Sequence, residues 1–290
     1  MVLKSLFITG TDTDVGKTYI TAGLAITLRK MSIDVGVMKP FAAGVAQKKG
    51  YKSEDVEILS KSAQTHDPEN LVNPQFFPIP ASPYTAWKKL KIKPKIPLVL
   101  SSFKKLSDMH EMVLVEGVGG ILTPILKDYY VTNLIKDMKI PTIIVTRSKV
   151  GTVNHTLMTV KMCEKYKIPI KGIIINNFDG DGYPINQLKK DLEDLTEVKV
   201  LGSIPFINDI NVVNGNLTIN GSSSYAEGVN STSAQAWKLL TDSSGNGIIT
   251  ANTTAAVTVI RLGASGDLSL IHISEPTRLL SISYAVFCLK

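Results

Sequence analysis

The sequence predicts an α/β fold in which helices cover both faces of a doubly wound, mostly parallel sheet. Short apolar runs that end at turn residues alternate with runs of helical spacing, an order typical of parallel sheets. Several apolar runs are nearly continuous, as expected for strands that are buried on both faces. The chain has 290 residues, of which 44% are hydrophobic. This is enough for one substantial core and a small appendage.

The stretch Gly10-Thr-Asp-Thr-Asp-Val-Gly16-Lys17-Thr18 lies between a strand-like run at 6–8 and a helix-like run at 19–28. Its spacing fits the phosphate-binding pattern G-x-x-x-x-G-K-[ST]. In this pattern, glycines let backbone N–H groups approach phosphate oxygens, the lysine reaches the outer phosphates and the hydroxyl holds Mg²⁺. The following helix adds its positive N-terminal dipole. The flanking strand and helix argue against a chance match, so we expect a P-loop NTPase-like fold that handles a nucleoside triphosphate.

Two charged residues follow the loop at places where chemistry is expected. A short strand-like run at 35–38 ends at Lys39, and open α/β sheets bind ligands at the carboxyl ends of their strands. Asp55 lies in the first turn of a helix predicted over 53–62. A carboxylate in the first turn also complements the helix dipole. The sequence therefore supports a structural role for Asp55 and a functional role equally.

The apolar run that begins at Met112 ends in Glu116, which is followed by three glycines in four positions. A carboxylate at a strand end beside a phosphate loop is similar to the acidic partner that P-loop enzymes use to hold Mg²⁺. The alternative is a solvent-exposed loop glutamate. Glycines at this density imply a close approach of the backbone to a neighbour, which favours the metal-site interpretation.

The proline-rich stretch at 73–97 is predicted to be a surface connection. Within it, Ser82 and Pro83 are typical of a helix start, since serine caps the first turn and proline fits the first helical position. We therefore expect one short helix here.

Buried-strand patterns recur at 141–146 and 171–177, with helical runs at 151–166 and 184–195. The first of these helices opens with Gly151-Thr-Val-Asn-His155, whose backbone N–H groups are suited to a carboxylate. A single histidine at such a position more often caps or packs than catalyses, so we expect a structural role for His155.

Charge and cysteine content restrict the partners and the compartment. Residues 1–209 carry 28 Lys and Arg against 21 Asp and Glu, whereas residues 210–290 carry four of each, so the net +7 lies in the first part. No arginine-rich run with interleaved aromatics favours nucleic acid, and we expect no nucleic-acid partner. Two distant cysteines favour a reducing compartment. Without a signal sequence or a long uncharged apolar run, the sequence predicts a cytoplasmic protein that does not bind membranes.

Composition changes near residue 210, after which Asn, Gly, Ser and Thr dominate. Strands are expected at 216–221 and 247–252. This part resembles the repetitive β-structure of phage tail or adhesin proteins, and the final stretch resembles translated sequencing-adaptor read-through. We therefore expect three parts: an ATP-dependent P-loop domain at 1–209, a β-like or disordered segment at 210–268, and an apolar tail at 269–290 that is foreign to the enzyme.

The motifs of the first 209 residues, taken in order, closely resemble those of dethiobiotin synthetases. The resemblance implies a homodimer that converts 7,8-diaminononanoate, CO₂ and ATP, with Mg²⁺, to dethiobiotin, ADP and phosphate. A carbamate formed from a substrate amine and CO₂ attacks the γ-phosphate, and the second amine then displaces phosphate. The matching motifs are Gly10 to Thr18, Met38-Lys39-Pro40, Asp55, Ser82-Pro83, Val115 to Gly120, Gly151 to His155, Asn176 and Leu201 to Pro205.

The resemblance also implies roles for individual residues. Catalytic roles fall on Thr13, Asp14, Lys17 and Lys39. The Mg²⁺ ligands are Thr18, Asp55 and Glu116. The nucleotide contacts are Gly10, Asp12, Val15, Gly16, Lys17, Thr18, Glu116, Gly119, Asn176 and Pro205. The substrate contacts are Lys39, Thr123, Gly151, Thr152, Val153 and Asn154, of which the last four receive the substrate carboxylate from the other subunit.

Three features depart from the family pattern. Ala42 and Ala43 stand where a serine or threonine is frequent, and Asn177 stands where an acidic residue is common. The segment after Pro205, which completes the adenine pocket in the family, here changes character.

Two other functions are compatible with parts of the sequence. A partition or division-site ATPase of the same P-loop group is a nucleotide switch that binds membranes or DNA. Such proteins usually carry a second lysine early in the loop, and Gly10-Thr11-Asp12 has none. They also end in an amphipathic helix when they bind membranes, and the sequence shows none. A phage structural protein with a captured ATPase domain is supported only by the C-terminal composition.

Overall fold

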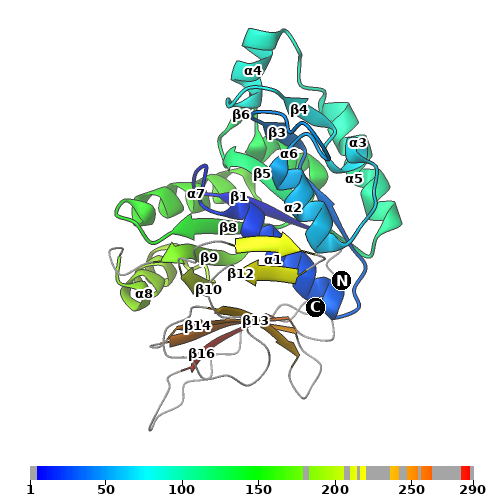
Figure 1. Cartoon of the computed structure of the whole chain (residues 1–290). Helices are drawn as coiled ribbons and strands as arrows, with labels where there is room; N and C mark the ends of the chain where they lie inside the picture. Colours follow the sequence, from blue (N-terminus) through cyan, green and yellow to red (C-terminus); the bar gives the residue numbers. More distant parts are fainter. Residues whose placement is uncertain are drawn as a thin grey trace.

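A six-stranded parallel sheet forms the centre of the molecule, with strand order β10-β9-β8-β1-β5-β2 (Figure 1). The computed structural model describes residues 5–178 and 183–205, and beyond residue 205 only the backbones of six strands. The sheet confirms the predicted doubly wound fold. Its strands are β1 (Ser5–Gly10), β2 (Val35–Met38), β5 (Met112–Gly120), β8 (Thr142–Arg147), β9 (Ile170–Phe178) and β10 (Val200–Pro205).

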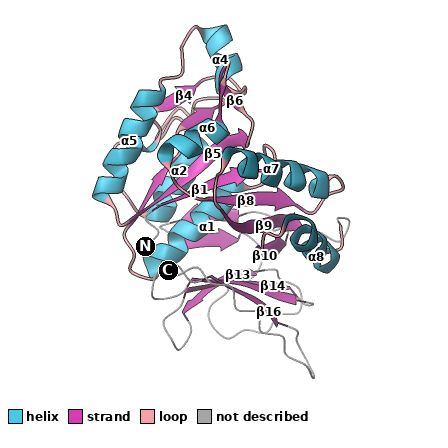
Figure 2. Ribbon diagram, turned by 180° about the vertical axis from the view of Figure 1, so that it is seen from behind, coloured by secondary structure: helices cyan, strands magenta, loops and turns pink. Residues whose placement is uncertain are grey.

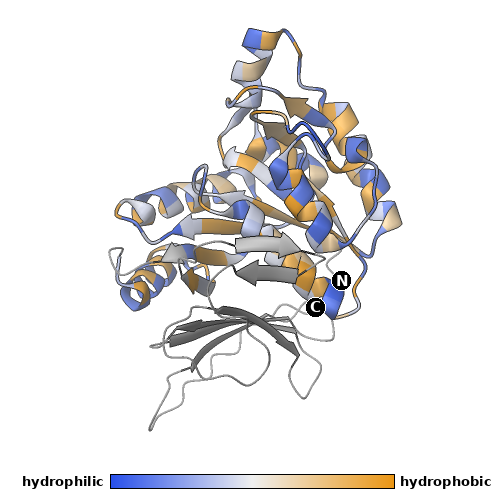
Figure 3. Cartoon of the chain, viewed as in Figure 1, coloured by the Kyte–Doolittle hydropathy of each residue, from blue (hydrophilic) through white to orange (hydrophobic). Residues whose placement is uncertain are grey.

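The described part of the chain contains eight helices, which lie on both faces of this sheet except for α4, which projects beyond it (Figure 2). Hydrophobic residues of α1 and α2 pack on one face, and those of α5, α6, α7 and α8 pack on the other. Hydrophilic and hydrophobic residues alternate along these helices (Figure 3). The helices are α1 (Lys17–Lys30), α2 (Glu54–Ala63), α3 (Glu69–Val72), α4 (Pro83–Leu90), α5 (Ile96–Met109), α6 (Val131–Met138), α7 (Thr152–Tyr166) and α8 (Ile185–Thr196).

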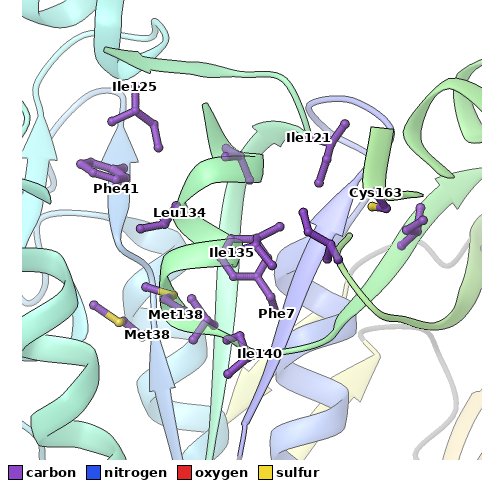
Figure 4. Close-up of a cluster of buried hydrophobic side chains, with 14 of the residues drawn as sticks. Phe7, Met38, Phe41, Ile121, Ile125, Leu134, Ile135, Met138, Ile140 and Cys163 are labelled. Atoms are coloured by element: carbon purple, nitrogen blue, oxygen red, sulfur yellow. The ribbon is translucent and has the colours of Figure 1, made fainter. Parts of the chain in front are cut away.

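The two core clusters follow from the alternation of side chains along each strand. In β1, Leu6 and Ile8 belong to the cluster under α1, whereas Phe7 points to the opposite cluster. All six residues of β1 are buried, as the continuous apolar pattern predicts for a central parallel strand. Figure 4 shows Phe7 among the side chains of the second cluster, including Ile135 from α6 and Cys163 from α7.

The proline-rich stretch at 73–97 is more structured than a surface connection. The predicted short helix is present as α4, and the Ser82 hydroxyl accepts a hydrogen bond from the N–H of Thr85 at 3.2 Å. The stretch also contains β4 (Gln75–Phe77), which pairs in parallel with β3 (Phe41–Ala43), and the first turn of α5. A short antiparallel pair, β6 (Pro124–Leu126) and β7 (Tyr129–Tyr130), follows β5 in the chain.

Beyond residue 205 the described backbone consists of strands. The predicted strands at 216–221 and 247–252 coincide with β12 and β14, whose backbones lie alongside α1. The rest of the predicted segments 210–268 and 269–290 lies outside the described residues, so their boundaries stay a prediction. These strands are β11 (Ile210–Val213), β12 (Asn216–Ile219), β13 (Ala236–Thr241), β14 (Gly247–Thr253), β15 (Ala256–Leu262) and β16 (Ile282–Phe287).

No helix in the described ranges has both the length and the apolar character needed to cross a lipid bilayer.

Candidate active site

The glycine-rich loop connects β1 to α1 at the carboxyl edge of the sheet, as the motif predicts. Gly16 caps α1 with φ 89°, a left-handed conformation that favours glycine. A Cβ at Gly16 would lie 1.9 Å from Nδ2 of Asn176, so a side chain has no room there. The first turn of α1 contains no acidic residue, which leaves its positive end available to an anion.

Lys17 is buried at the start of α1, and its ammonium donates to the Asp12 carbonyl at 2.8 Å. Burial, together with the nearby charge of Lys39, lowers the pKa of Lys17 to about 8. The side chain therefore lies along the loop. An anionic ligand bound there would favour the charged form of Lys17.

Four predicted residues meet beside this lysine, three of them from α1, α2 and β5 and the fourth, Lys39, from the position after β2. The Lys39 ammonium contacts Asp55 Oδ2 at 2.8 Å and also Glu116 Oε1. The Thr18 hydroxyl contacts Asp55 Oδ1 at 3.1 Å and Glu116 Oε1 at 2.9 Å. Glu116 is only 1% exposed and lies within β5, so the alternative of a solvent-exposed loop glutamate was wrong.

The charges in this cluster depend on one another. Burial works to lower the pKa of Lys39, but Glu116 and Asp55 outweigh it and the pKa is raised. Burial likewise works to raise the pKa of Asp55, and the neighbouring ammonium of Lys39 outweighs it, so that pKa is lowered. For Glu116, burial raises the pKa against the opposing influence of Lys39. Lys39 is therefore a cation at neutral pH and the main stabiliser of both carboxylates.

The donor set at this position fits a hard cation. Glu116 Oε2 is buried and has no hydrogen-bond partner in the described structure, although its other oxygen has two. Within the described residues, no group of three or more His, Cys, Asp or Glu side chains forms an all-protein metal cage. Mg²⁺ is usually bound by one or two carboxylates together with phosphates and waters. Two carboxylates and the Thr18 hydroxyl beside a phosphate loop match that pattern.

Neighbouring strands hold the loop in place. Asn176, in β9, donates from Nδ2 to the Val15 carbonyl at 3.0 Å and is buried. Arg147, the last residue of β8, donates from Nη2 to the Thr13 carbonyl at 3.0 Å. Nothing in the loop motif predicts Arg147, although a charge at the end of a buried strand is the same signal that indicates Lys39.

The remaining predicted contacts, on the loop and around the ends of β5 and β10, lie at the same edge. Thr13 and Asp14 are exposed, and Asp14 has φ 55°, an uncommon value outside glycine. Gly119 has φ 59°, and a Cβ there would lie 2.4 Å from the Thr123 hydroxyl. Pro205 ends β10, and its side chain, like that of Asn177, lies outside the described residues.

The start of α7 is capped by Gly151 with φ 93°. Thr152 is buried, with its N–H bonded to the Lys149 carbonyl and its hydroxyl to the Arg147 carbonyl. Val153 is half-buried, whereas Asn154 and His155 are exposed. His155 does not cap the helix and is not packed in the core, so the expected structural role for it was wrong.

A doubly wound sheet, a glycine-rich loop at a helix start and a buried lysine with two carboxylates define a P-loop nucleotide-binding protein. In agreement, residues 4–213 match a family model described as an AAA domain. The chain is 79% identical over 208 residues to the ATP-dependent dethiobiotin synthetase BioD of Nitrosopumilus maritimus (strain SCM1), covering 72% of this chain and 91% of that protein. It is 37% identical over 209 residues to BioD of Bacillus subtilis (strain 168), covering 72% and 90%. The chain belongs to the dethiobiotin synthetase family.

Similarity to solved structures is weaker. The MinC:MinD cell division protein complex of Aquifex aeolicus is 16% identical with a TM-score of 0.43, covering 70% of this chain and 81% of that one. A ParA family ATPase from Chlorobium tepidum TLS is 14% identical with a TM-score of 0.42, covering 71% and 84%. The high identity to BioD favours the synthetase family over the partition or division-site ATPases.

Proposed function

We propose that this chain is an ATP-dependent dethiobiotin synthetase, which closes the ureido ring on 7,8-diaminononanoate with CO₂ and ATP. The observation that carries the proposal is the pair of buried lysines, Lys17 and Lys39, at the carboxyl edge of the sheet. Two cations beside a phosphate loop suit a reaction in which a carbamate and a γ-phosphate, both anionic, must approach each other.

The chemistry needs anion stabilisation and no protein nucleophile. A substrate amine adds to CO₂ and loses a proton, which gives a carbamate. A carbamate oxygen then attacks the γ-phosphorus and ADP departs. The second amine attacks the carbamate carbon of the resulting anhydride, loses a proton and expels phosphate. We assign Lys17, at the end of the phosphate loop, to neutralise charge on the phosphoryl group. We assign Lys39 to neutralise charge on the carbamate.

Mg²⁺ would be held by Thr18, Asp55 and Glu116, where the free Oε2 of Glu116 offers an additional oxygen. When bound, the ion supplies charge neutralisation on the nucleotide phosphates. The low pKa of Asp55 supports this assignment, because the carboxylate is ionised at neutral pH.

The remaining ligand contacts are assigned by position. Substrate contacts fall on Thr123 and on the start of α7, where the N–H groups of Val153 and Asn154 are suited to a carboxylate because Thr152 is engaged within the protein. Asn176 is assigned to the nucleotide as well, and its hydrogen bond to the phosphate loop supports that assignment. The other contacts are those of the phosphate loop itself, Gly10, Asp12, Thr13, Asp14, Val15 and Gly16, together with Gly119 and Pro205.

We further propose that the enzyme is a cytoplasmic homodimer. Support for a partner near the start of α7 comes from Val150, which is 93% exposed, and Met158, which is 53% exposed. Burial of these two side chains against another subunit would remove their apolar surface from water. Light scattering during size-exclusion chromatography measures the mass, and a monomer at micromolar concentration would contradict the proposed dimer.

Isotope incorporation tests the proposed activity. With diaminononanoate, ATP, Mg²⁺ and ¹³C-bicarbonate, mass spectrometry is expected to detect dethiobiotin that is heavier by one mass unit than the product formed from unlabelled bicarbonate. A reaction without diamine is the control. Absence of labelled product, with ATP bound and the protein folded, would reject the proposed function.

A further inference from the structure

A buried group of threonine hydroxyls joins the phosphate loop to α7. Thr146, in β8, is fully buried, and its Oγ1 lies 3.2 Å from the hydroxyl of Thr11 in the loop. The same atom lies 2.6 Å from Oγ1 of Thr152 and 3.0 Å from Oγ1 of Thr156, both on α7. One hydroxyl therefore contacts three others that come from two different elements.

Donor counting assigns a direction to these hydrogen bonds, since a hydroxyl has one proton and two acceptor positions. Thr152 donates to the Arg147 carbonyl at 2.6 Å, so it must accept from Thr146. Thr146 has then used its proton, and it accepts from Thr156 and from Thr11. The chain of donors runs from Thr11 through Thr146 and Thr152 to the backbone of β8. Every position of the Thr146 hydroxyl is occupied.

Two further contacts reinforce this connection on the side of the loop. The N–H of Thr11 donates to the Val145 carbonyl at 2.9 Å, and Arg147 donates to the Thr13 carbonyl at 3.0 Å. The first half of the loop is thus bonded to the end of β8, and the end of β8 is bonded to the first turn of α7. A displacement of the loop that left that turn unchanged would break the contact of Thr11 with the buried Thr146 hydroxyl, and a buried hydroxyl that loses a partner is costly.

We propose that Thr146 is a positioning residue that couples the phosphate loop to the first turn of α7, so that nucleotide bound at the loop stabilises that turn. The part that concerns the diamine rests on the proposed function, in which this turn receives the substrate carboxylate. The part that concerns the nucleotide does not. Thr146 itself touches no ligand in this proposal, and it acts through Thr11 and Thr152.

Hydrogen–deuterium exchange with adenylyl imidodiphosphate and Mg²⁺ as the probe tests the coupling. In the unaltered chain, the nucleotide analogue is expected to slow exchange of the amides at 155–160. Thr146→Val removes the hydroxyl at nearly constant volume, and Thr146→Ser retains it. Thr11→Val removes only the hydroxyl that the loop contributes to the network. This variant tests the coupling if Thr146→Val does not fold. Thr159→Val is the matched control, because the Thr159 hydroxyl bonds the His155 carbonyl outside the network.

Loss of the network is expected to reduce the protection of 155–160 by about fivefold, the equivalent of about 1 kcal/mol for one hydrogen bond. Thr146→Ser and Thr159→Val are expected to retain the protection of these amides by the nucleotide analogue. In turnover, Thr146→Val is expected to raise KM for the diamine more than it lowers kcat. Protection that is absent in the unaltered chain, or is unaffected by both Thr146→Val and Thr11→Val, overturns the proposal. Since exchange requires no turnover, it separates this failure from failure of the proposed synthetase activity.

Discussion

Lys39 and Glu116 lie side by side because β2 and β5 are parallel neighbours, with Met38 opposite Val115. The next residue of each strand brings the ammonium of Lys39 against the carboxylate of Glu116, and both side chains are almost fully buried. Strand register thus places the main electrostatic contact of the site. Without Lys39, Glu116 would be a buried ion that has lost its ion-pair partner, whereas Lys39 without Glu116 would still contact Asp55.

Replacing Lys39 by methionine should therefore destabilise the protein as well as inactivate it. We expect Lys39→Met to lower the free energy of unfolding in urea by about 3 kcal/mol or more, since a buried partner is left charged. The double variant with Glu116→Gln should lose less stability than Lys39→Met alone. As control, Lys61→Met removes an exposed pair with Glu57 and should cost about 0.5 kcal/mol or less. A loss for the double variant equal to the sum of the losses for Lys39→Met and Glu116→Gln would show that the two charges do not interact.

Removal of one carboxylate from the proposed metal site should raise the Mg²⁺ concentration needed for half-maximal turnover. Glu116→Gln and Asp55→Asn each take a negative oxygen ligand from a hard cation. Titration of the rate with Mg²⁺ at saturating ATP measures the effect. Glu57→Gln, two residues from Asp55 in α2, is the control and should behave like the unaltered chain. If both site variants matched that control at limiting Mg²⁺, the assignment of the ligands would be incorrect.

Cys163 should resist alkylation for as long as the core is intact. It is fully buried on α7, and burial raises the pKa of its thiol to about 12. Iodoacetamide reacts with the thiolate, so labelling between pH 8 and 9.5 should stay slow in the folded protein and become rapid in urea. Replacing Cys288 by serine leaves Cys163 as the single thiol to be followed by mass spectrometry. Rapid complete labelling of the folded protein would contradict the packing of α7 on the sheet.

Residues 1–209 should form the cooperative unit, without a contribution from residues 210–290. The polar segment at 211–254 offers little apolar surface to offset the entropy of ordering it. Limited proteolysis should release a stable core that ends near residue 209, with termini read by mass spectrometry. The backbones of β12 and β14 lie alongside α1, so the alternative is that they pack stably on the core. A protected fragment that extends past residue 260 and unfolds with the same midpoint as the core would contradict the predicted boundary.

The parts of the site that could be predicted from sequence are those with a local signal or a shared sheet edge. All residues of the phosphate loop are consecutive from Gly10 to Thr18. Lys39 follows one recognisable buried strand and Glu116 ends the apolar run of another, and the carboxyl ends of parallel strands meet at one edge.

The threonine network has no such signal. The hydroxyls of Thr11 and Thr146 meet across 135 positions of sequence, and nothing in either segment indicates which threonines turn inward. Helix α5 was missed for a different reason. Pro97 lies in its first turn, where the missing N–H costs nothing, but in the sequence it extends a proline-rich stretch that indicates a loop. The expectation for His155 was wrong because its position in the first turn does not show which face of the helix packs against the protein. The structure leaves His155 exposed.

The dependence of ATP consumption on the other two substrates tests the central claim most directly. The nucleophile for the γ-phosphate is a carbamate that forms in the site, so phosphate release should require the diamine and CO₂ together. We expect rapid release of one phosphate per dethiobiotin when both are present, and near-background release when either is omitted. Brisk release of phosphate from ATP without diamine would contradict the account and would instead indicate a nucleotide switch.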